Sequence, residues 1–155
     1  MNGKTWTDRL AQLGIVLPTA PAPVAAYVPA IRTGNQVWTS GQLPFTGGEL
    51  PATGLVGQDV DTAQAADLAR TATLNALAAV DALVGIDNVV RVLKVVGYVA
   101  SSPGFGEQPQ VVNGASEILG EIFGAAGQHA RSAVGVAELP LHSPVEVEIV
   151  VEIAG

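Results

Sequence analysis

The sequence predicts one α/β (α+β) domain, in which a mixed sheet carries two long helices on one face. Two Ala- and Leu-containing stretches repeat apolar residues every three or four positions, as amphipathic helices do, and they alternate with Val-rich stretches typical of strands. The last stretch, Val145–Ile153, alternates apolar residues mostly with glutamates, which is the pattern of a strand with one buried face. A chain of 155 residues is long enough for one hydrophobic core and too short for two.

The N-terminal segment is expected to form a short helix followed by an extended connection. Thr7 is the predicted cap of a helix over Asp8–Leu13, and Gly14 is its stop signal. Three prolines then favour an extended backbone, namely Pro18, Pro21 and Pro23. We therefore treat residues 1–20 as an extension at the front of a single domain over residues 1–155.

A hairpin and a long helix are expected next. Apolar runs at Ala26–Arg32 and Gln36–Ser40 flank Thr33-Gly34-Asn35, and Gly and Asn tolerate the positive φ of a tight hairpin turn. Asp61-Thr62-Ala63-Gln64 has the spacing of a capping box and begins a helix that runs to Val84. The stripe expected to face the core comprises Ala69, Ala72, Ala76, Val80 and Leu83.

The second half is expected to supply three strands and a second long helix. Val89–Ala100 is Val-rich and bounded by turn residues, which favours a strand buried largely on both faces. Pro109 marks the loop before a helix over Val111–Phe123, and strands at Ala130–Leu139 and Val145–Ile153 close the chain. The stripe of this second helix comprises Val111, Ala115, Ile118 and Ile122.

The composition disfavours several classes of protein. Seven Lys and Arg against fourteen Asp and Glu give a net charge of −7, and no two basic residues are adjacent, so nucleic-acid binding is disfavoured. The chain has no cysteine and only two histidines, so we expect no metal site. The sequence holds no apolar run of membrane length and no signal-peptide core, so we expect a cytoplasmic protein that binds no membrane.

The proportion of charged residues is unusually low. It is 14%, whereas an ordinary domain has about 25%. So few charges do not cover the surface of a monomer, which indicates that part of this surface meets another subunit.

Arg131 is the first candidate for a binding residue. Side chains alternate along a strand, so Arg131 shares its face with three small residues: Ala133, Gly135 and Ala137. We expect this face to lie opposite the helices. A guanidinium with space in front of it suits a substrate carboxylate, which accepts two parallel hydrogen bonds. An ion pair with Glu146 or Glu148 on a neighbouring strand is the alternative, and spacing alone favours that alternative.

Several further residues could serve a site or could be structural. Glu146, Glu148 and Glu152 share one strand face, and one of them could orient a water as general base or acid; periodicity does not say which one. The remaining candidates each have an ordinary structural explanation and are Tyr27, Ser40, Gly41, Asn113 and His129.

With these residues in view, the chain resembles the RidA family, also called the YjgF family. Arg131, a Leu-Pro turn and Glu146 keep the spacing of the family signature, and Asn113 precedes the second helical stripe as the family's Asn does. The chain thus looks like a longer subgroup of the family with an N-terminal extension. The matching stretches are Ala20–Tyr27, Gly34-Asn35, Thr39–Pro44, Ala130–Val134, Leu139-Pro140 and Val145–Glu148.

This resemblance implies a chorismate-mutase-like fold with a six-stranded type of mixed sheet, assembled as a homotrimer with its site between subunits. It implies a deaminase that hydrolyses reactive 2-imino acids or their enamine tautomers to 2-keto acids and ammonia without a cofactor. Arg131 would then hold the substrate carboxylate, and Glu146 would position the attacking water. The resemblance places five further residues in the pocket lining, namely Tyr27, Ser40, Gly41, Asn113 and Ala133.

Three departures from the family pattern leave alternatives open. Ala133 stands where many deaminating members carry Cys, and Ala25-Ala26 replaces the usual Gly-Pro before the Tyr. The N-terminal helix and the longer loop around Ser101–Pro109 are additions, like those of the longer subgroup. The second hypothesis is therefore a non-catalytic protein that binds a small carboxylate or carbonyl metabolite in the same cleft. A third, the ribonuclease role sometimes assigned to the family, is disfavoured by the net charge of −7.

Overall fold

The computed structural model describes residues 3–20, 22 and 25–155. Pro21, Pro23 and Val24, which belong to the expected extended segment and to the first family-like stretch, lie outside the described residues. Three regular helices and five strands follow one another in the predicted order, with short 3₁₀ turns between some of them. The bounds are α1 Trp6–Gln12, β1 Ala30–Thr33, β2 Gln36–Thr39, α2 Thr62–Val84, η1 Ile86–Asn88, β3 Val89–Ala100, α3 Gln108–Phe123, η2 Gly124–Gly127, β4 Ala130–Val136, η3 Pro140–His142 and β5 Val145–Ile153.

The strands form one mixed sheet in the order β1-β2-β5-β3-β4. Only β3 and β4 run parallel, and the other neighbours are antiparallel. The sheet of the described residues therefore has five strands, as the order of elements predicts, and the six-stranded type implied by the resemblance is wrong in this number. The family-like architecture itself, a mixed sheet with two long helices, is confirmed.

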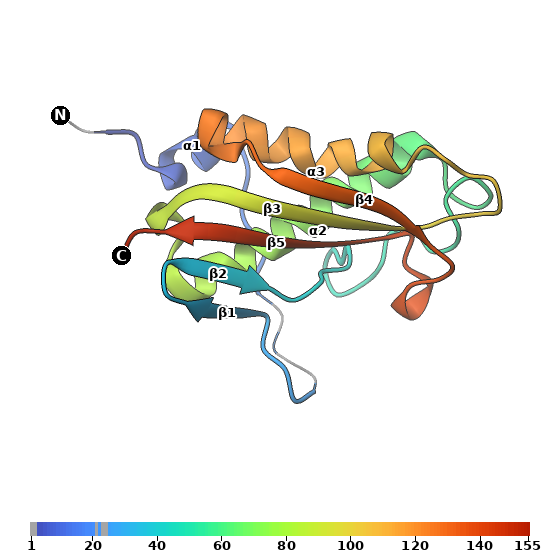
Figure 1. Cartoon of the computed structure of the whole chain (residues 1–155), viewed down its shortest axis with the longest axis horizontal. Coiled ribbons are helices and arrows are strands. Elements are labelled where there is room, and N and C mark those ends of the chain that lie inside the picture. Colours follow the sequence, from blue (N-terminus) through green and yellow to red (C-terminus); the bar gives the residue numbers. More distant parts are fainter. Residues whose placement is uncertain (1–2, 21, 23–24) are drawn as a thin grey trace.

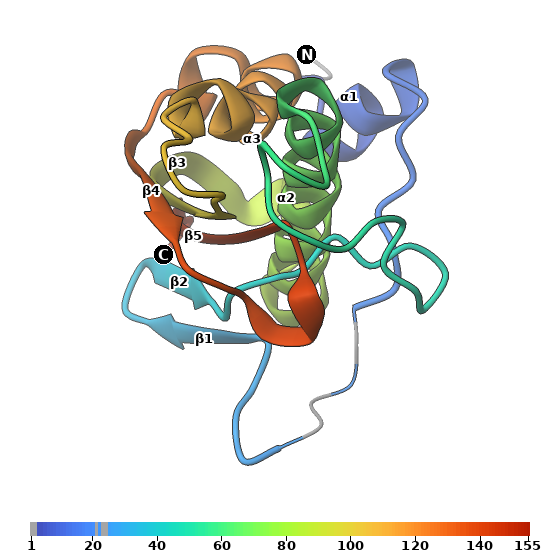
Figure 2. The ribbon, with the colours of Figure 1, turned by 90° about the vertical axis from the view of Figure 1, so that its right-hand side faces the viewer.

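Both long helices cover the same face of the sheet (Figures 1 and 2). The alternation of β5 decides which face this is, because Val145, Val147, Ile149, Val151 and Ile153 are all buried while the residues between them are half-buried. The stripe predicted for α3 is buried as well. In α2 the stripe is buried except at Leu83 in the last turn, which is 46% exposed.

The two helices pack closely at a glycine. A Cβ placed on Gly114 of α3 would collide with the backbone carbonyl of Ala66 in α2. The α2 helix begins as predicted, since the Asp61 side chain accepts a hydrogen bond from the backbone N–H of Gln64 at 2.8 Å. The α3 helix begins at Gln108, three residues earlier than predicted, because proline is tolerated in the first helical turn.

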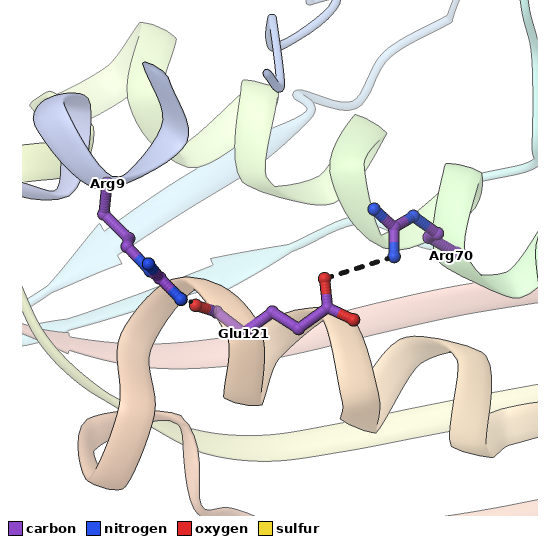
Figure 3. A network of polar contacts seen from close by, with 3 residues as sticks. All are labelled: Arg9, Arg70 and Glu121. Carbon is purple, nitrogen blue, oxygen red and sulfur yellow. Dashed lines mark hydrogen bonds and ion pairs between the residues drawn. The ribbon is translucent and has the colours of Figure 1, made fainter. Parts of the chain in front are cut away.

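The α1 helix is anchored to the rest of the chain near the end of α3. The Trp6 indole donates to the Val89 carbonyl at 2.7 Å and packs edge-on against Phe123, with ring centroids 5.0 Å apart. Glu121 lies between two arginines (Figure 3): its carbonyl accepts from Arg9 Nε at 2.9 Å, and its carboxylate pairs with Arg70 at 3.4 Å.

Thr5, and not Thr7, caps this helix. The Thr5 hydroxyl accepts from the Asp8 N–H, and the Asp8 carboxylate accepts from the Thr5 N–H, which is a complete capping box. Thr7 instead donates both its N–H and its hydroxyl to Asp87 at 2.8 Å, a contact between segments 80 residues apart. None of the helices in the described part of the chain combines the length and the apolar character that a membrane crossing requires.

Candidate active site

Arg131 is held against α3 by neutral acceptors. Its Nη1 donates to Asn113 Oδ1 at 2.8 Å and to Ser116 Oγ at 3.1 Å, and its Nη2 donates to the Pro109 carbonyl at 3.3 Å. A guanidinium has five N–H donors, so these three bonds leave two donors without an acceptor in the described part of the chain. The arrangement keeps the positive charge of Arg131 unneutralised and two N–H groups available to a ligand.

The face of Arg131 differs from the prediction. In β4 this residue lies beside Val95 of β3, and residues paired across two strands point to the same side of the sheet. Val95 is fully buried under the helices, so Arg131 points to the helical side and not to the opposite face. Neither alternative partner of Arg131 is found, because β3 lies between β4 and β5, which carries Glu146 and Glu148. Strand order is a long-range property that residue spacing does not reveal.

Ala133 lies two residues along the same face of β4, next to Gly97 of β3. It is half-buried and packs against the hydrophobic core. We call Asn113, Arg131 and Ala133 the arginine group. Three hydrogen bonds join Arg131 to α3, and the group lies on the helical side of the sheet and not on the predicted side.

Glu146 lies in a second group on the open side of the sheet. A hollow of about 460 Å³ is lined by Tyr27, Gly41 and Glu146, which we call the glutamate group. Apolar side chains complete most of this lining, including Leu43, Phe45 and Leu141. Glu146 thus faces a space large enough for a small organic acid, with an aromatic hydroxyl side chain at the same hollow.

Gly41 permits a close approach to the Glu146 carboxylate. A Cβ at position 41 would lie 2.5 Å from Glu146 Oε2, so a larger residue would displace that carboxylate. Ser40, the preceding residue, does not line the hollow. Its hydroxyl donates to the Val28 carbonyl at 2.6 Å and its N–H donates to the Pro29 carbonyl, so it fastens the Tyr27 segment beside β2.

The surroundings of Glu146 disfavour its charged form. Burial raises the pKa of the Glu146 carboxyl, and the nearby negative charge of Glu148 raises it further. Glu148 in turn accepts a hydrogen bond from the Tyr98 hydroxyl at 2.6 Å, and that bond, with burial and the two carboxylates, raises the pKa of Tyr98 to about 12. A carboxyl with a raised pKa binds a proton more readily than an ordinary glutamate does, which suits a group that takes up and returns a proton.

The two groups do not meet within one chain. Arg131 is beside Val95 of β3, whereas Glu146 is beside Tyr98, three residues further along the strand. Three residues of strand correspond to about 10 Å. Side chains alternate along a strand, so two positions that are three residues apart point to opposite faces of the sheet. The sheet itself therefore separates the arginine group from the glutamate group.

Sequence reasoning missed Ser116, which contacts Arg131 directly. The available signal was its position three residues after Asn113, which places both side chains on the same side of a helix. His129, which sequence reasoning gave little weight, bonds to Ser116 at 2.9 Å. No group of three potential metal-binding His, Asp or Glu side chains occurs among residues 3–20, 22 and 25–155.

The open face of the sheet combines an apolar patch with charged residues. Trp38 of β2 is 50% exposed and lies between Ile31 of β1, which is 60% exposed, and Val150 of β5. Val134 of β4 is also exposed, and a hollow of about 440 Å³ reaches from Trp38 across β5 to β3. Exposed apolar side chains thus gather around Trp38, on a face that also carries Lys94 and the glutamates of β5.

Comparison with known proteins places this fold and this spacing of residues in a family. The family model described as "YjgF/chorismate mutase-like, putative endoribonuclease" matches residues 7–153. The chain belongs to the YjgF (RidA) family. Protein TCP17 of Trypanosoma cruzi is similar to it, with 42% identity over 146 residues that cover 93% of this chain and 91% of that protein.

Two further relatives of this YjgF-family chain are informative. A 2-iminobutanoate/2-iminopropanoate deaminase of Dermatophagoides farinae is 32% identical over 139 residues, which cover 90% of this chain and 94% of that protein. The crystal structure of an Agrobacterium tumefaciens protein of unknown function has 44% identity and a TM-score of 0.89, covering 96% of this chain and 92% of that one. Family and fold are thus shown.

Proposed function

We propose that this protein is a deaminase that hydrolyses reactive 2-imino acids, or their enamine tautomers, to 2-keto acids and ammonia. The observation that carries the proposal is that each chain holds an arginine without a carboxylate partner and a partly buried glutamate beside a hollow. Arg131 is surrounded by neutral acceptors with two donors left, and Glu146 has a raised pKa and faces a hollow of about 460 Å³. The relative in Dermatophagoides farinae, named a 2-iminobutanoate/2-iminopropanoate deaminase, supports this reaction class.

The proposed chemistry needs only these side chains and water. Arg131 binds the substrate carboxylate through its free N–H groups. Glu146 accepts a proton from a water as the oxygen of that water attacks the imine carbon, and it returns this proton to the nitrogen, which gives a neutral tetrahedral amino alcohol. Glu146 then takes the hydroxyl proton and delivers it to the nitrogen, so the C–N bond breaks and ammonia leaves as the C=O bond forms. One water is consumed, and no oxidation or reduction occurs.

The proposed site forms between copies of the chain in a homotrimer. One chain holds its arginine group and its glutamate group on opposite sides of the sheet, so a complete site needs the arginine group of one subunit and the glutamate group of the next. The apolar open face around Trp38 supplies the surface on which such copies would meet. Closed rings of identical subunits are a common result of such contacts.

The primary test compares the decay of enzymatically generated 2-iminopropanoate in the presence of wild type, Arg131→Ala and Glu146→Gln. We expect Arg131→Ala to lose about a hundredfold in kcat/KM, because charge-assisted bonds to the substrate disappear. Glu146→Gln should lose on the order of a hundredfold or more in kcat, since it removes the acid–base group. Wild type that matches the buffer blank would overturn the proposal.

Mixing the two variants tests the position of the site between subunits. Neither variant alone should be active. If subunits exchange freely, about one interface in four combines an intact Glu146 with an intact Arg131 from the neighbouring subunit, so about a quarter of wild-type activity should return. Two variants that stay inactive after demonstrated subunit exchange would show that the site lies within one chain.

The lack of a polar group at Ala133 favours one alternative, a protein that binds a small carboxylate without turnover. Calorimetry with 2-ketobutyrate distinguishes the two functions. Binding that Arg131→Ala abolishes, together with no acceleration of imine decay by wild type, would assign the binding function to the same residues.

A further inference from the structure

His129 stands directly before β4 and makes two hydrogen bonds with its ring. Its Nδ1 lies 2.6 Å from the Gly127 carbonyl oxygen, and its Nε2 lies 2.9 Å from Ser116 Oγ. A carbonyl oxygen only accepts, so Nδ1 carries the hydrogen, and Nε2 of the neutral ring is then an acceptor. The Ser116 hydroxyl therefore donates its hydrogen to His129.

This assignment fixes the direction of the next bond. With its hydrogen directed to His129, Ser116 Oγ presents only lone pairs to Arg131, whose Nη1 donates to it at 3.1 Å. Both hydrogens of Nη1 are then used, because Asn113 Oδ1 accepts the other at 2.8 Å. The bonds from Arg131 to Ser116, His129 and Gly127 run in one sense, and bonds in such a chain polarise and strengthen one another.

Gly127, the last acceptor in this series of hydrogen bonds, is held in a fixed place. Gly127 is buried in η2, and a Cβ on it would collide with the Leu119 carbonyl of α3, so the backbone of η2 rests directly on that helix. Ser116 belongs to the same helix. The Gly127 carbonyl, which accepts from His129, therefore packs on the same helix that carries Ser116, which accepts from Arg131.

We propose that Ser116 and His129 are positioning residues that hold the Arg131 guanidinium in the orientation in which its two remaining N–H groups meet the substrate carboxylate. Neither residue touches the substrate. The inference rests on the proposed function, since a fixed guanidinium matters only if Arg131 binds the substrate carboxylate. A guanidinium fixed before binding loses less conformational freedom when the carboxylate arrives, which strengthens binding.

The first experiment examines the hydrogen bonds themselves by ¹⁵N NMR of histidine-labelled wild type. We expect His129 to show a protonated Nδ1 and an unprotonated Nε2, with His142 as the internal reference. In Ser116→Ala the Nε2 signal of His129 should shift, and in a second sample labelled at arginine the rotation of the Arg131 guanidinium should become faster. A His129 ring protonated at Nε2 alone would overturn the proposal.

The second experiment measures imine hydrolysis. Ser116→Ala should raise KM about tenfold, equal to about 1.4 kcal/mol, with little change in kcat, because a looser guanidinium weakens substrate and transition-state binding alike. Ser116→Thr should restore KM because it keeps a hydroxyl. His129→Phe should raise KM in the same direction, and the double variant with Ser116→Ala should be no worse than Ser116→Ala alone. Alanine favours the helix, so Ser116→Ala should fold.

Glu117→Gln, an exposed neighbour on α3, is the matched control. An active wild type together with a Ser116→Ala variant whose KM equals that of Glu117→Gln would overturn the positioning role alone. Additive effects of Ser116→Ala and His129→Phe would also overturn it. A wild type that neither hydrolyses the imine nor binds 2-ketobutyrate would overturn the proposed function, and the positioning role with it.

Discussion

The two charged residues of the candidate site lie in opposite electrostatic environments. Arg131 has only neutral hydrogen-bond acceptors, which orient it without cancelling its charge. Glu146 lies partly buried near a second carboxylate, and both effects raise its pKa. In the proposed reaction, the surroundings of Arg131 suit the binding of an anion, and those of Glu146 suit the exchange of a proton.

Gly41 provides a direct test of the Glu146 position. Gly41→Ala would place a Cβ 2.5 Å from Glu146 Oε2, so the carboxylate must turn away from its present place. We expect kcat to fall on the order of a hundredfold, because small displacements of a reacting group are costly, while the melting temperature changes little. Gly106→Ala, where the added Cβ meets no described atom within 4 Å, is the control. Equal kcat values for the two variants would contradict this role of Gly41.

The pH dependence of kcat/KM tests the coupling between Glu146 and Glu148. A general base works only when ionised, so the raised pKa of Glu146 places the acidic limb above the pH expected for an ordinary glutamate. Glu148→Gln removes the negative neighbour but leaves Glu146 buried, so the limb should move to lower pH without reaching the ordinary position. Glu152→Gln, further along the same face, should leave the limb in place. An unmoved limb in Glu148→Gln would contradict the coupling.

At the residue scale, the sequence predicted the identity of the key residues better than their partners. The strand pattern and the family resemblance singled out Arg131 and Glu146. The predicted alternation along β5 was also correct. The sheet face of Arg131 was predicted wrongly, because alternation within β4 does not say which of its two faces the helices cover.

At the scale of elements, the contact between α2 and α3 depends on Gly114. Gly114→Ala would drive a methyl group into the Ala66 carbonyl, so the helices must separate. We expect the free energy of unfolding to fall by about 3 kcal/mol, as for severe overpacking of a core. Gly120→Ala in the same helix meets no described atom within 4 Å and should raise stability by up to about 1 kcal/mol through helix propensity. Urea unfolding of both variants measures the difference, and equal midpoints would contradict the prediction.

The elements that the sequence predicted well are those with strong periodicity. The bounds of α2, β3 and β5 match the prediction because each has a long regular pattern between turn signals. The ends set by tertiary contacts differ. The cap of α1 is Thr5 because Asp87 engages Thr7, and β1 begins only at Ala30 because its partner β2 is four residues long. Such partners are distant in sequence, so local patterns do not contain them.

At the scale of the whole molecule, the open face of the sheet links the composition to the proposed assembly. Trp38 lies half exposed between Ile31 and Val150, which makes the part of this face around β1 and β2 apolar. A chain with 14% charged residues that gathers exposed apolar side chains on one face is suited to bury that face against copies of itself. The arginine and glutamate groups would then become complete only in the assembly.

Trp38→Glu tests this relation between assembly and activity. The substitution puts a charge into the apolar patch around Trp38, where burying it unpaired would be costly, so we expect light scattering to show wild type as a trimer and the variant as a monomer. The variant should stay folded, because the side chain lies outside the core, yet it should lose imine hydrolysis although it keeps Arg131 and Glu146. Val16→Glu, at a position 90% exposed, should retain both the trimer and the activity. A monomeric wild type, or a monomeric Trp38→Glu variant with full activity, would show that the site does not need a second subunit.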